Sequence, residues 1–99
     1  MTYELRQNYP NPFNPTTTIE FELPTEAVVT LTVYNVLGQQ VTTLLDHQLL
    51  EDGEQQVEFD AASYASGMYL YRITAQPVST GDGAPAQTFT TVRKMMLLK

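Results

Sequence analysis

Few residues in the chain have the types and spacing that catalysis requires. The single histidine, His47, directly follows Asp46, and there is no cysteine. A catalytic nucleophile needs a base within hydrogen-bond reach and usually a third group that orients the base. No Gly-x-Ser-x-Gly motif surrounds Ser63, Ser66 or Ser79. We therefore expect no catalytic centre, no cofactor, no small-molecule substrate and no zinc–thiolate site.

The acidic residues suggest cation binding only weakly. Glu20 and Glu22 share one face of an alternating run, roughly 7 Å apart by strand rise, which suits acid–base work or calcium as well as a solvated face. A second group is dense but lacks EF-hand spacing: Asp46, Glu51, Asp52 and Glu54. Both interpretations stay open for each group, and no metal ligand is assigned.

Charge is distributed unevenly along the chain. The net charge is −6 and the isoelectric point is near 4.4, which disfavours binding to nucleic acid. Residues 1–60 hold ten acids and one base, whereas residues 61–99 hold one acid and four bases. This division could pair strands across a sheet, or it could leave a basic C-terminal edge for a partner.

Composition predicts one folded domain over residues 1–99, with residues 1–4 as a linker or an added start. Apolar residues make up 42% of the chain, charged residues 16% and aromatic residues 10%. Disordered chains are poorer in aromatics and richer in charge, and a typical domain has roughly 100–150 residues. No apolar run of about 18 residues suggests a membrane span.

Short alternating runs rich in Thr, Val, Ile, Tyr and Phe predict an all-β fold. The expected strands cover residues 17–23, 27–35, 39–45, 54–60, 67–76 and 87–99, with a mobile loop at 77–86. Residues 44–50 could instead form two turns of helix. The spacing of the turns predicts an immunoglobulin-like β-sandwich of about seven antiparallel strands. The side chains expected to face inward are Ile19, Phe21, Leu31, Val33, Val57, Phe59, Tyr69, Tyr71 and Ile73.

Three prolines and three asparagines make residues 8–16 the most unusual segment. Proline lacks the amide donor and holds the preceding residue extended, so the segment cannot form a central strand. We expect a stiff loop in which Phe13 or Tyr9 plugs one end of the sandwich. The loop is either a structural lid or a recognition loop.

The strand expected at the end of the chain has apolar side chains on both faces, and the sequence does not say what covers the second face. As a strand, it places Met95 and Leu97 on one face and Met96 and Leu98 on the other. An apolar strand at a sheet edge is an aggregation hazard unless something uses it, which favours a docking role. Upstream, Tyr69 occupies the place of a corner tyrosine in immunoglobulin-like domains, and Tyr71 the place of their cysteine.

Five segments, read together, resemble a known family. They are NYPNPFNPTT at 8–17, IEFELP at 19–24, VYNVLGQQV at 33–41, SGMYLYR at 66–72 and KMMLLK at 94–99. In order and spacing they resemble the type A C-terminal sorting domain of type IX secretion cargo, over residues 5–99. That family is similar to the immunoglobulin-like domain of flagellar hook-assembly proteins.

The resemblance implies a non-enzymatic module at the C-terminus of a larger secreted protein of Bacteroidetes and their relatives. The implied partners are the outer-membrane translocon, the sortase-like components of the type IX system and a cargo domain upstream on the same chain. The implied route passes through the periplasm to the cell surface or the medium. The residues expected to be recognised are Asn11, Pro12, Phe13, Asn14, Pro15, Gly67, Tyr69, Lys94, Met95, Leu97 and Lys99.

Two other functions remain open from the sequence. An immunoglobulin-like module could attach a secreted enzyme to the cell surface or to carbohydrate, although the chain has no Trp to build an aromatic platform. The second open function is that of a purely structural spacer, although a spacer would not explain an apolar final strand.

Overall fold

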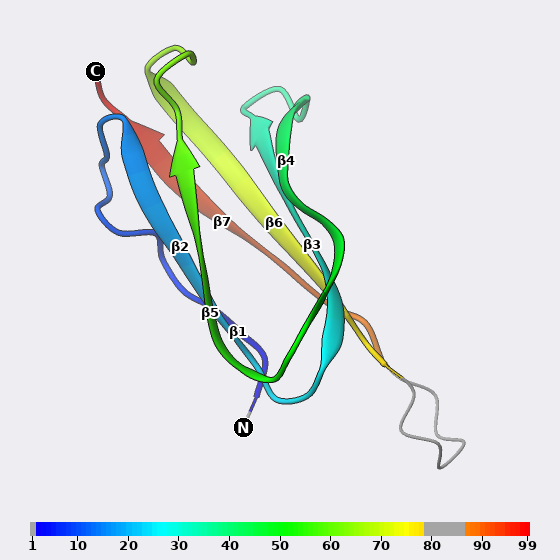
Figure 1. The fold of residues 1–99 in the computed structure, drawn as a ribbon. Coiled ribbons are helices and arrows are strands. Elements are labelled where there is room, and N and C mark those ends of the chain that lie inside the picture. Colours follow the sequence, from blue (N-terminus) through cyan, green and yellow to red (C-terminus); the bar gives the residue numbers. More distant parts are fainter. Residues whose placement is uncertain (1, 79–86) are drawn as a thin grey trace.

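Two antiparallel sheets pack face to face in the computed structural model, which describes residues 2–78 and 87–99 (Figure 1). One sheet has the order β1-β2-β5, formed by β1 (Glu4–Leu5), β2 (Thr16–Leu23) and β5 (Gly53–Asp60). The other has the order β4-β3-β6-β7, formed by β3 (Ala27–Asn35), β4 (Gln40–Leu50), β6 (Gly67–Pro77) and β7 (Phe89–Leu97). The described residues contain no helix, and therefore none that could cross a membrane. The predicted all-β sandwich is confirmed.

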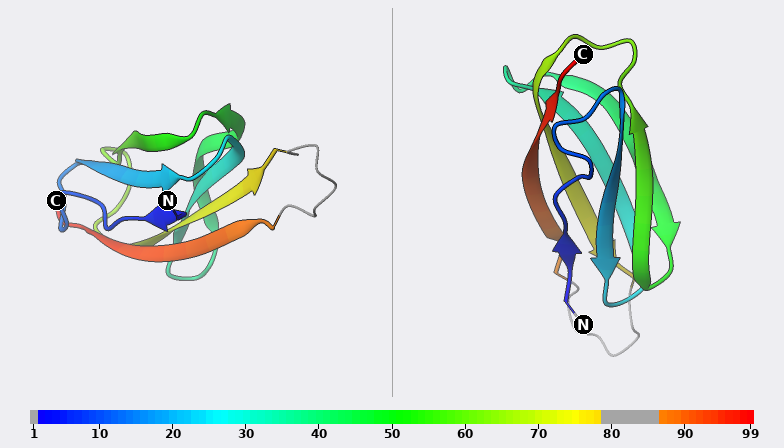
Figure 2. Two further views of the ribbon diagram at one scale, coloured as in Figure 1. Left: turned by 90° about the horizontal axis from the view of Figure 1, so that it is seen from below. Right: turned by 90° about the vertical axis from the view of Figure 1, so that its left-hand side faces the viewer.

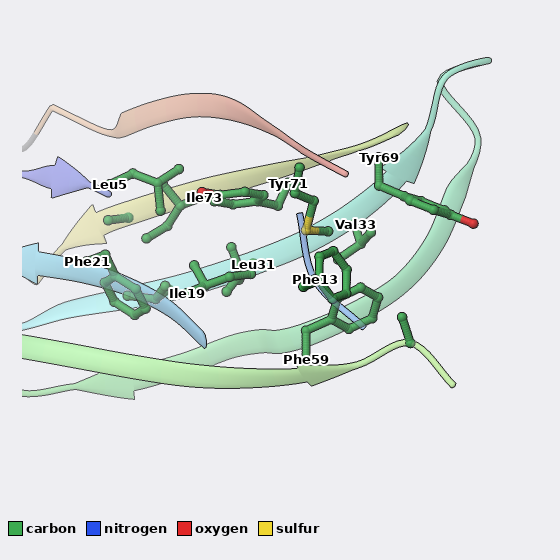
Figure 3. Close-up of a cluster of buried hydrophobic side chains, with 14 of the residues drawn as sticks. Leu5, Phe13, Ile19, Phe21, Leu31, Val33, Phe59, Tyr69, Tyr71 and Ile73 are labelled. Carbon is green, nitrogen blue, oxygen red and sulfur yellow. The ribbon is translucent and has the colours of Figure 1, made fainter. Parts of the chain in front are cut away.

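Strict alternation of side chains explains why these runs form half-buried strands. In β2 every second residue is buried, so Ile19, Phe21 and Leu23 face the other sheet while Glu20 and Glu22 face outward. In β6 the same pattern buries Tyr69, Tyr71, Ile73 and Ala75. The two inner faces meet to form a single core (Figure 3).

The predicted core residues are confirmed with one difference. Eight of the nine are buried, and Val57 is only half-buried, packed against the edge of the core. Val57 lies on β5, which is the edge strand of the three-stranded sheet, so its inner face is open on one side. The sequence analysis did not include Leu5, Phe13, Met95 and Leu97 in the core list, and all four are buried.

β4 is a bulged edge strand, so the helix considered for residues 44–50 is wrong. Its pairing with β3 shifts register at three places, and one shift places Asp46 and His47 opposite the single residue Thr30. The bulge turns the His47 backbone to φ 48°. An inserted residue interrupts the alternation of side chains, which explains why the pattern of residues 46–50 did not predict a strand.

The start of the chain belongs to the sandwich. The expected linker at residues 1–4 includes Glu4, which pairs with Glu22 in β1, and Tyr3, whose ring stacks on Phe89 with centroids 5.0 Å apart. A strand of only two residues carries no readable alternation. At the predicted loop 77–86, Pro77 ends β6 and Val78 donates to the Glu26 carbonyl, while residues 79–86 lie outside the described residues.

Residues 5–13, here called the strap, cross the open side of the sandwich from β2 to β7 (Figure 2). Beside β2, the Arg6 amide donates to the Glu20 carbonyl, and Tyr9 bridges Thr18 in antiparallel fashion. Beyond three cis X–Pro bonds at Pro10, Pro12 and Pro15, the chain enters β2. The strap thus connects the edges of both sheets.

Candidate recognition surface

The Asn-Pro segment and the end of β7 lie side by side, although the sequence separates them by more than 80 residues. Phe13 forms a parallel β-bridge with Leu97. The Phe13 amide donates to the Met96 carbonyl at 2.9 Å, and the Leu98 amide donates to the Phe13 carbonyl at 3.0 Å. Two of the predicted recognition segments therefore form one surface at one end of the sandwich.

Burial divides the predicted recognition residues into two groups. The side chains of Phe13, Tyr69, Met95 and Leu97 are at most 8% exposed and belong to the core. Gly67 is half-buried. The exposed residues are Asn11, Pro12, Asn14, Pro15, Lys94 and Lys99. In the folded domain, only this exposed group offers side chains to a partner.

Phe13 is the residue that plugs the end of the sandwich. It is 2% exposed, and its ring centroid lies 6.0 Å from that of Phe59 (Figure 3). The Phe59 ring in turn stacks on Tyr64 at 5.9 Å. Tyr9, the alternative plug, is 77% exposed. The lid interpretation accounts for Phe13, while the residues on either side of it remain on the surface.

A buried polar network holds the strap on the core. The Asn8 side chain is 2% exposed, and its Nδ2 donates to the Pro10 carbonyl and to Thr17 Oγ1, while its Oδ1 accepts from Gln7 Nε2 at 2.7 Å. Thr17 Oγ1 also donates to the Pro10 carbonyl at 2.9 Å. Every polar atom of this buried amide is paired, which is the condition under which burying an amide is tolerated.

The Tyr71 hydroxyl attaches the strap to β6. It donates to the Arg6 carbonyl at 2.7 Å and accepts from the Asn8 amide at 2.8 Å. Burial raises the pKa of Tyr71, against the smaller lowering effects of the Asn8 hydrogen bond and the charge of Arg93. The group is therefore a neutral phenol at physiological pH, able to donate and accept at once.

The edge of β7 receives further bonds from the strap. Gln7 Nε2 donates to the Lys94 carbonyl at 2.7 Å, and the Met96 amide donates to Asn11 Oδ1 at 2.9 Å. The Arg93 guanidinium donates to the Leu5 carbonyl. The outer edge of the final strand, which we expected to be open for docking, is covered from Lys94 to Leu98.

The turn at residues 61–66 and the C-terminal lysine complete this end of the molecule. Lys99 Nζ donates to the Ala62 carbonyl at 2.6 Å, and the Lys99 amide donates to Ser66 Oγ at 3.0 Å. The Tyr69 hydroxyl donates to the Ala65 carbonyl, the backbone contact expected of a corner tyrosine. Gly67 has φ 151°, a conformation that a residue with a Cβ rarely adopts.

Glu4, Glu20, Glu22 and Glu54 lie on the three-stranded sheet, whereas Arg72, Arg93 and Lys94 lie on the four-stranded sheet. Arg6 is surrounded by Glu4, Glu20, Glu22 and Glu54 at 3.0–3.8 Å, and hydrogen bonds to Glu54 and Glu4 raise its pKa. Within the described residues no ion pair joins the bases of β6, β7 or the C-terminus to a carboxylate. The charge division therefore leaves a basic C-terminal region instead of pairing strands across a sheet.

A shallow hollow of about 240 Å³ lies on the outer face of the four-stranded sheet, between Tyr34, Gly38, Leu70, Arg72 and Val92. The Arg72 guanidinium lies 5.0 Å from the centre of the Tyr34 ring. This contact covers the ring with a cation and leaves no bare aromatic platform in the hollow.

The residues considered for catalysis or metal binding do not form one common site. His47 Nδ1 contacts Asp46 at 2.7 Å, and both side chains are more than three-quarters exposed. In the part of the chain that the structure describes, no three acidic or imidazole groups converge to hold a metal ion. Glu20, Glu22 and Glu54 contact Arg6 instead.

Sequence reasoning missed the importance of Asn8 and Thr17. Thr17 has the same parity as Ile19, Phe21 and Leu23, so its inward position was readable from the alternation. An inward threonine needs a polar partner, and the nearby Asn8 supplies one. No local pattern signals the contact of Asn8 with Tyr71, because 63 residues separate the two.

Comparison with known proteins adds a family and a fold. Residues 7–81 match the model of the family described as the secretion system C-terminal sorting domain. The chain is also similar to the crystal structure of CopC from Methylosinus trichosporium OB3b, with a TM-score of 0.58 and 12% identity, covering 97% of this chain and 93% of that one. At this identity the likeness shows the β-sandwich fold alone. No curated protein matches the sequence.

Proposed function

Because the chain belongs to the family of type IX secretion system C-terminal sorting domains, we propose that it directs an upstream cargo protein out of the cell. The family match over residues 7–81 is the observation that carries this proposal. The family is non-catalytic and serves secretion to the cell surface or the exterior. The proposed role of this chain is therefore recognition, and we propose that it has no enzymatic activity of its own.

The proposed partners are the outer-membrane translocon and the sortase-like components of the type IX system, met by the folded domain in the periplasm. A folded domain can be recognised only through its surface. Asn11, Pro12, Asn14 and Pro15 are exposed at the end of the sandwich where β7 finishes, and Lys94 and Lys99 are exposed in and after that strand. We assign recognition to this group and a structural role to the buried members of the predicted set.

The two lysines give the cleanest test of this surface. Lys99 is exposed and its Nζ donates to the Ala62 carbonyl, and the Lys94 side chain is also exposed. Replacing both with Glu should change the free energy of unfolding by about 0.5 kcal/mol or less per site, as is usual for exposed positions. If a partner recognises these charges, export of a reporter fused upstream of Thr2, so that Tyr3 and Glu4 stay in place, should nevertheless fall sharply.

The experiment compares the reporter in the culture medium and at the cell surface of a host with type IX machinery. Arg72→Glu is the control for a single charge reversal, because it lies on the outer face of the four-stranded sheet, in the hollow beside Tyr34, and it is compared with Lys94→Glu alone. Circular dichroism and melting temperature must show that all variants fold. Normal export by the double variant would deny the lysines a recognition role. Normal export after deletion of the whole domain would contradict the proposed function itself.

A further inference from the structure

β7 is an edge strand whose outward backbone groups already have partners from the same chain. Four groups are occupied along Lys94–Leu98: the Lys94 carbonyl by Gln7, the Met96 amide by Asn11, and the Met96 carbonyl and Leu98 amide by Phe13. Two of these bonds come from side chains and two from the backbone of one residue. The strap thus occupies the edge without forming a full strand there.

Phe13 binds this edge in the manner of an added β-strand. Its backbone bridges Leu97 in parallel, and its side chain enters a pocket of the core beside Phe59. Strand addition combines the same two elements: main-chain hydrogen bonds to a sheet edge, and pockets that receive side chains of the added peptide.

The strap is a poor strand on either side of this contact. After Phe13, the next residue whose amide would face β7 is Pro15, which has no N–H to donate. Before Phe13, the Met96 amide is bonded by the Asn11 side chain and not by a backbone carbonyl. Tyr9, Pro10, Pro12 and Asn14 are exposed and bury little apolar surface. A peptide that presents ordinary amides beside β7 could form a longer ladder than residues 11–13 do.

We infer that the edge of β7 from Lys94 to Leu98, with the pocket of Phe13, is an acceptor site for an extended peptide. The ligand carries one aromatic side chain and runs parallel to β7. In the resting chain, residues 11–13 occupy this site themselves. The site is a property of the fold and does not depend on the export role.

Removing the internal occupant tests the site. Phe13→Ala in the full chain empties the pocket, and a fluorescently labelled peptide with the sequence of residues 7–14 serves as the probe. Because occupation by the strap lowers the competent fraction, the probe should bind Phe13→Ala about tenfold or more tightly than the unaltered chain. Amide resonances of Met96 and Leu98 should shift on binding. The same peptide with Ala in place of Phe13 should bind neither protein.

Asn11→Ala provides a second variant if Phe13→Ala does not fold. It keeps Phe13 in the core and removes only the bond to the Met96 amide. Hydrogen exchange at Met96 should then quicken, and affinity for the probe should rise above that of the unaltered chain. Saturating peptide that leaves the Met96 and Leu98 amides of a folded variant unchanged would overturn the inference. Equal binding of the peptide with and without its aromatic ring would also overturn it.

Discussion

The backbone amide of Asn8 donates a hydrogen bond to the hydroxyl of Tyr71 at 2.8 Å, across 63 residues of sequence. The same hydroxyl donates to the Arg6 carbonyl. The fully buried Tyr71 side chain of β6 therefore holds the backbone of the strap against the core. Because the strap also pairs with β7, this contact helps to keep it beside the final strand.

Tyr71→Phe should lower the free energy of unfolding by about 1–3 kcal/mol, because the buried Asn8 amide and the Arg6 carbonyl lose their partner. Urea denaturation at pH 7 measures the change. Tyr69→Phe is the matched control. It removes a hydroxyl whose partner is the carbonyl of the exposed residue Ala65, so the loss of unfolding free energy should be smaller. Equal losses for the two variants would argue against a special role for the Tyr71 network.

Stability should decline in alkaline solution. Burial raises the pKa of Tyr71 and of Tyr3 above the value near 10 that tyrosine has in an unfolded chain. The folded state holds these protons more tightly, so their contribution is fully present below about pH 10 and is lost as the pH rises further. Urea midpoints between pH 8 and 11 should show the fall, with a shallower slope in Tyr71→Phe. Parallel curves for the two proteins would contradict this assignment.

Truncation of the core phenylalanines should be severe. Phe21→Ala and Phe59→Ala each remove a fully buried ring and should cost roughly 3–5 kcal/mol, a large share of the stability of such a domain. Val57→Ala, at the half-buried edge, should cost clearly less. Thermal unfolding of the three variants checks the order, and a Phe59 variant as stable as the Val57 variant would be inconsistent with this core.

Loss of Arg6 should make stability depend on salt. Arg6 is the cation between Glu4, Glu20, Glu22 and Glu54. In Arg6→Met the four carboxylates face one another without it, so the melting temperature should fall at low ionic strength and recover partly when salt screens the repulsion. Unaltered protein should show a smaller salt response. A salt response unchanged by the substitution would mean that the carboxylates act independently.

His47 should be dispensable. Its side chain is exposed and forms a surface contact with Asp46, so His47→Ala should leave the free energy of unfolding within about 0.5 kcal/mol. His47→Gly should raise stability by less than about 1 kcal/mol, because glycine tolerates the positive φ of the bulge. Melting temperatures of the two variants provide the test. A large loss in His47→Ala would point to a contact beyond Asp46.

Sequence alone predicted the parts of the fold that depend on alternation. Ile19 and Phe21 in β2, and Tyr71 and Ile73 in β6, follow the period of two, and all are buried as predicted. The bulges of β4 and the two residues of β1 were missed, since an inserted residue breaks the period and two residues cannot show one.

The sequence predicted which segments form the candidate surface, but it did not predict that they contact each other. The Asn-Pro segment and the C-terminal residues both drew attention by their unusual chemistry. That Asn11 and Phe13 pair with Met96 and Leu98 is a long-range contact, set by the path of the strap and not by any local pattern. This contact also reversed the expectation of an open edge at β7.

The strap also determines how the domain would respond to tension. β1 begins at one end of the sandwich and β7 finishes at the other (Figures 1 and 2). A pull between these two ends acts along the strands and across the hydrogen bonds that join the strap to β2 and β7. Such bonds are loaded together in shear and do not open one after another. With the C-terminal end held, a protein attached upstream would therefore load these hydrogen bonds together.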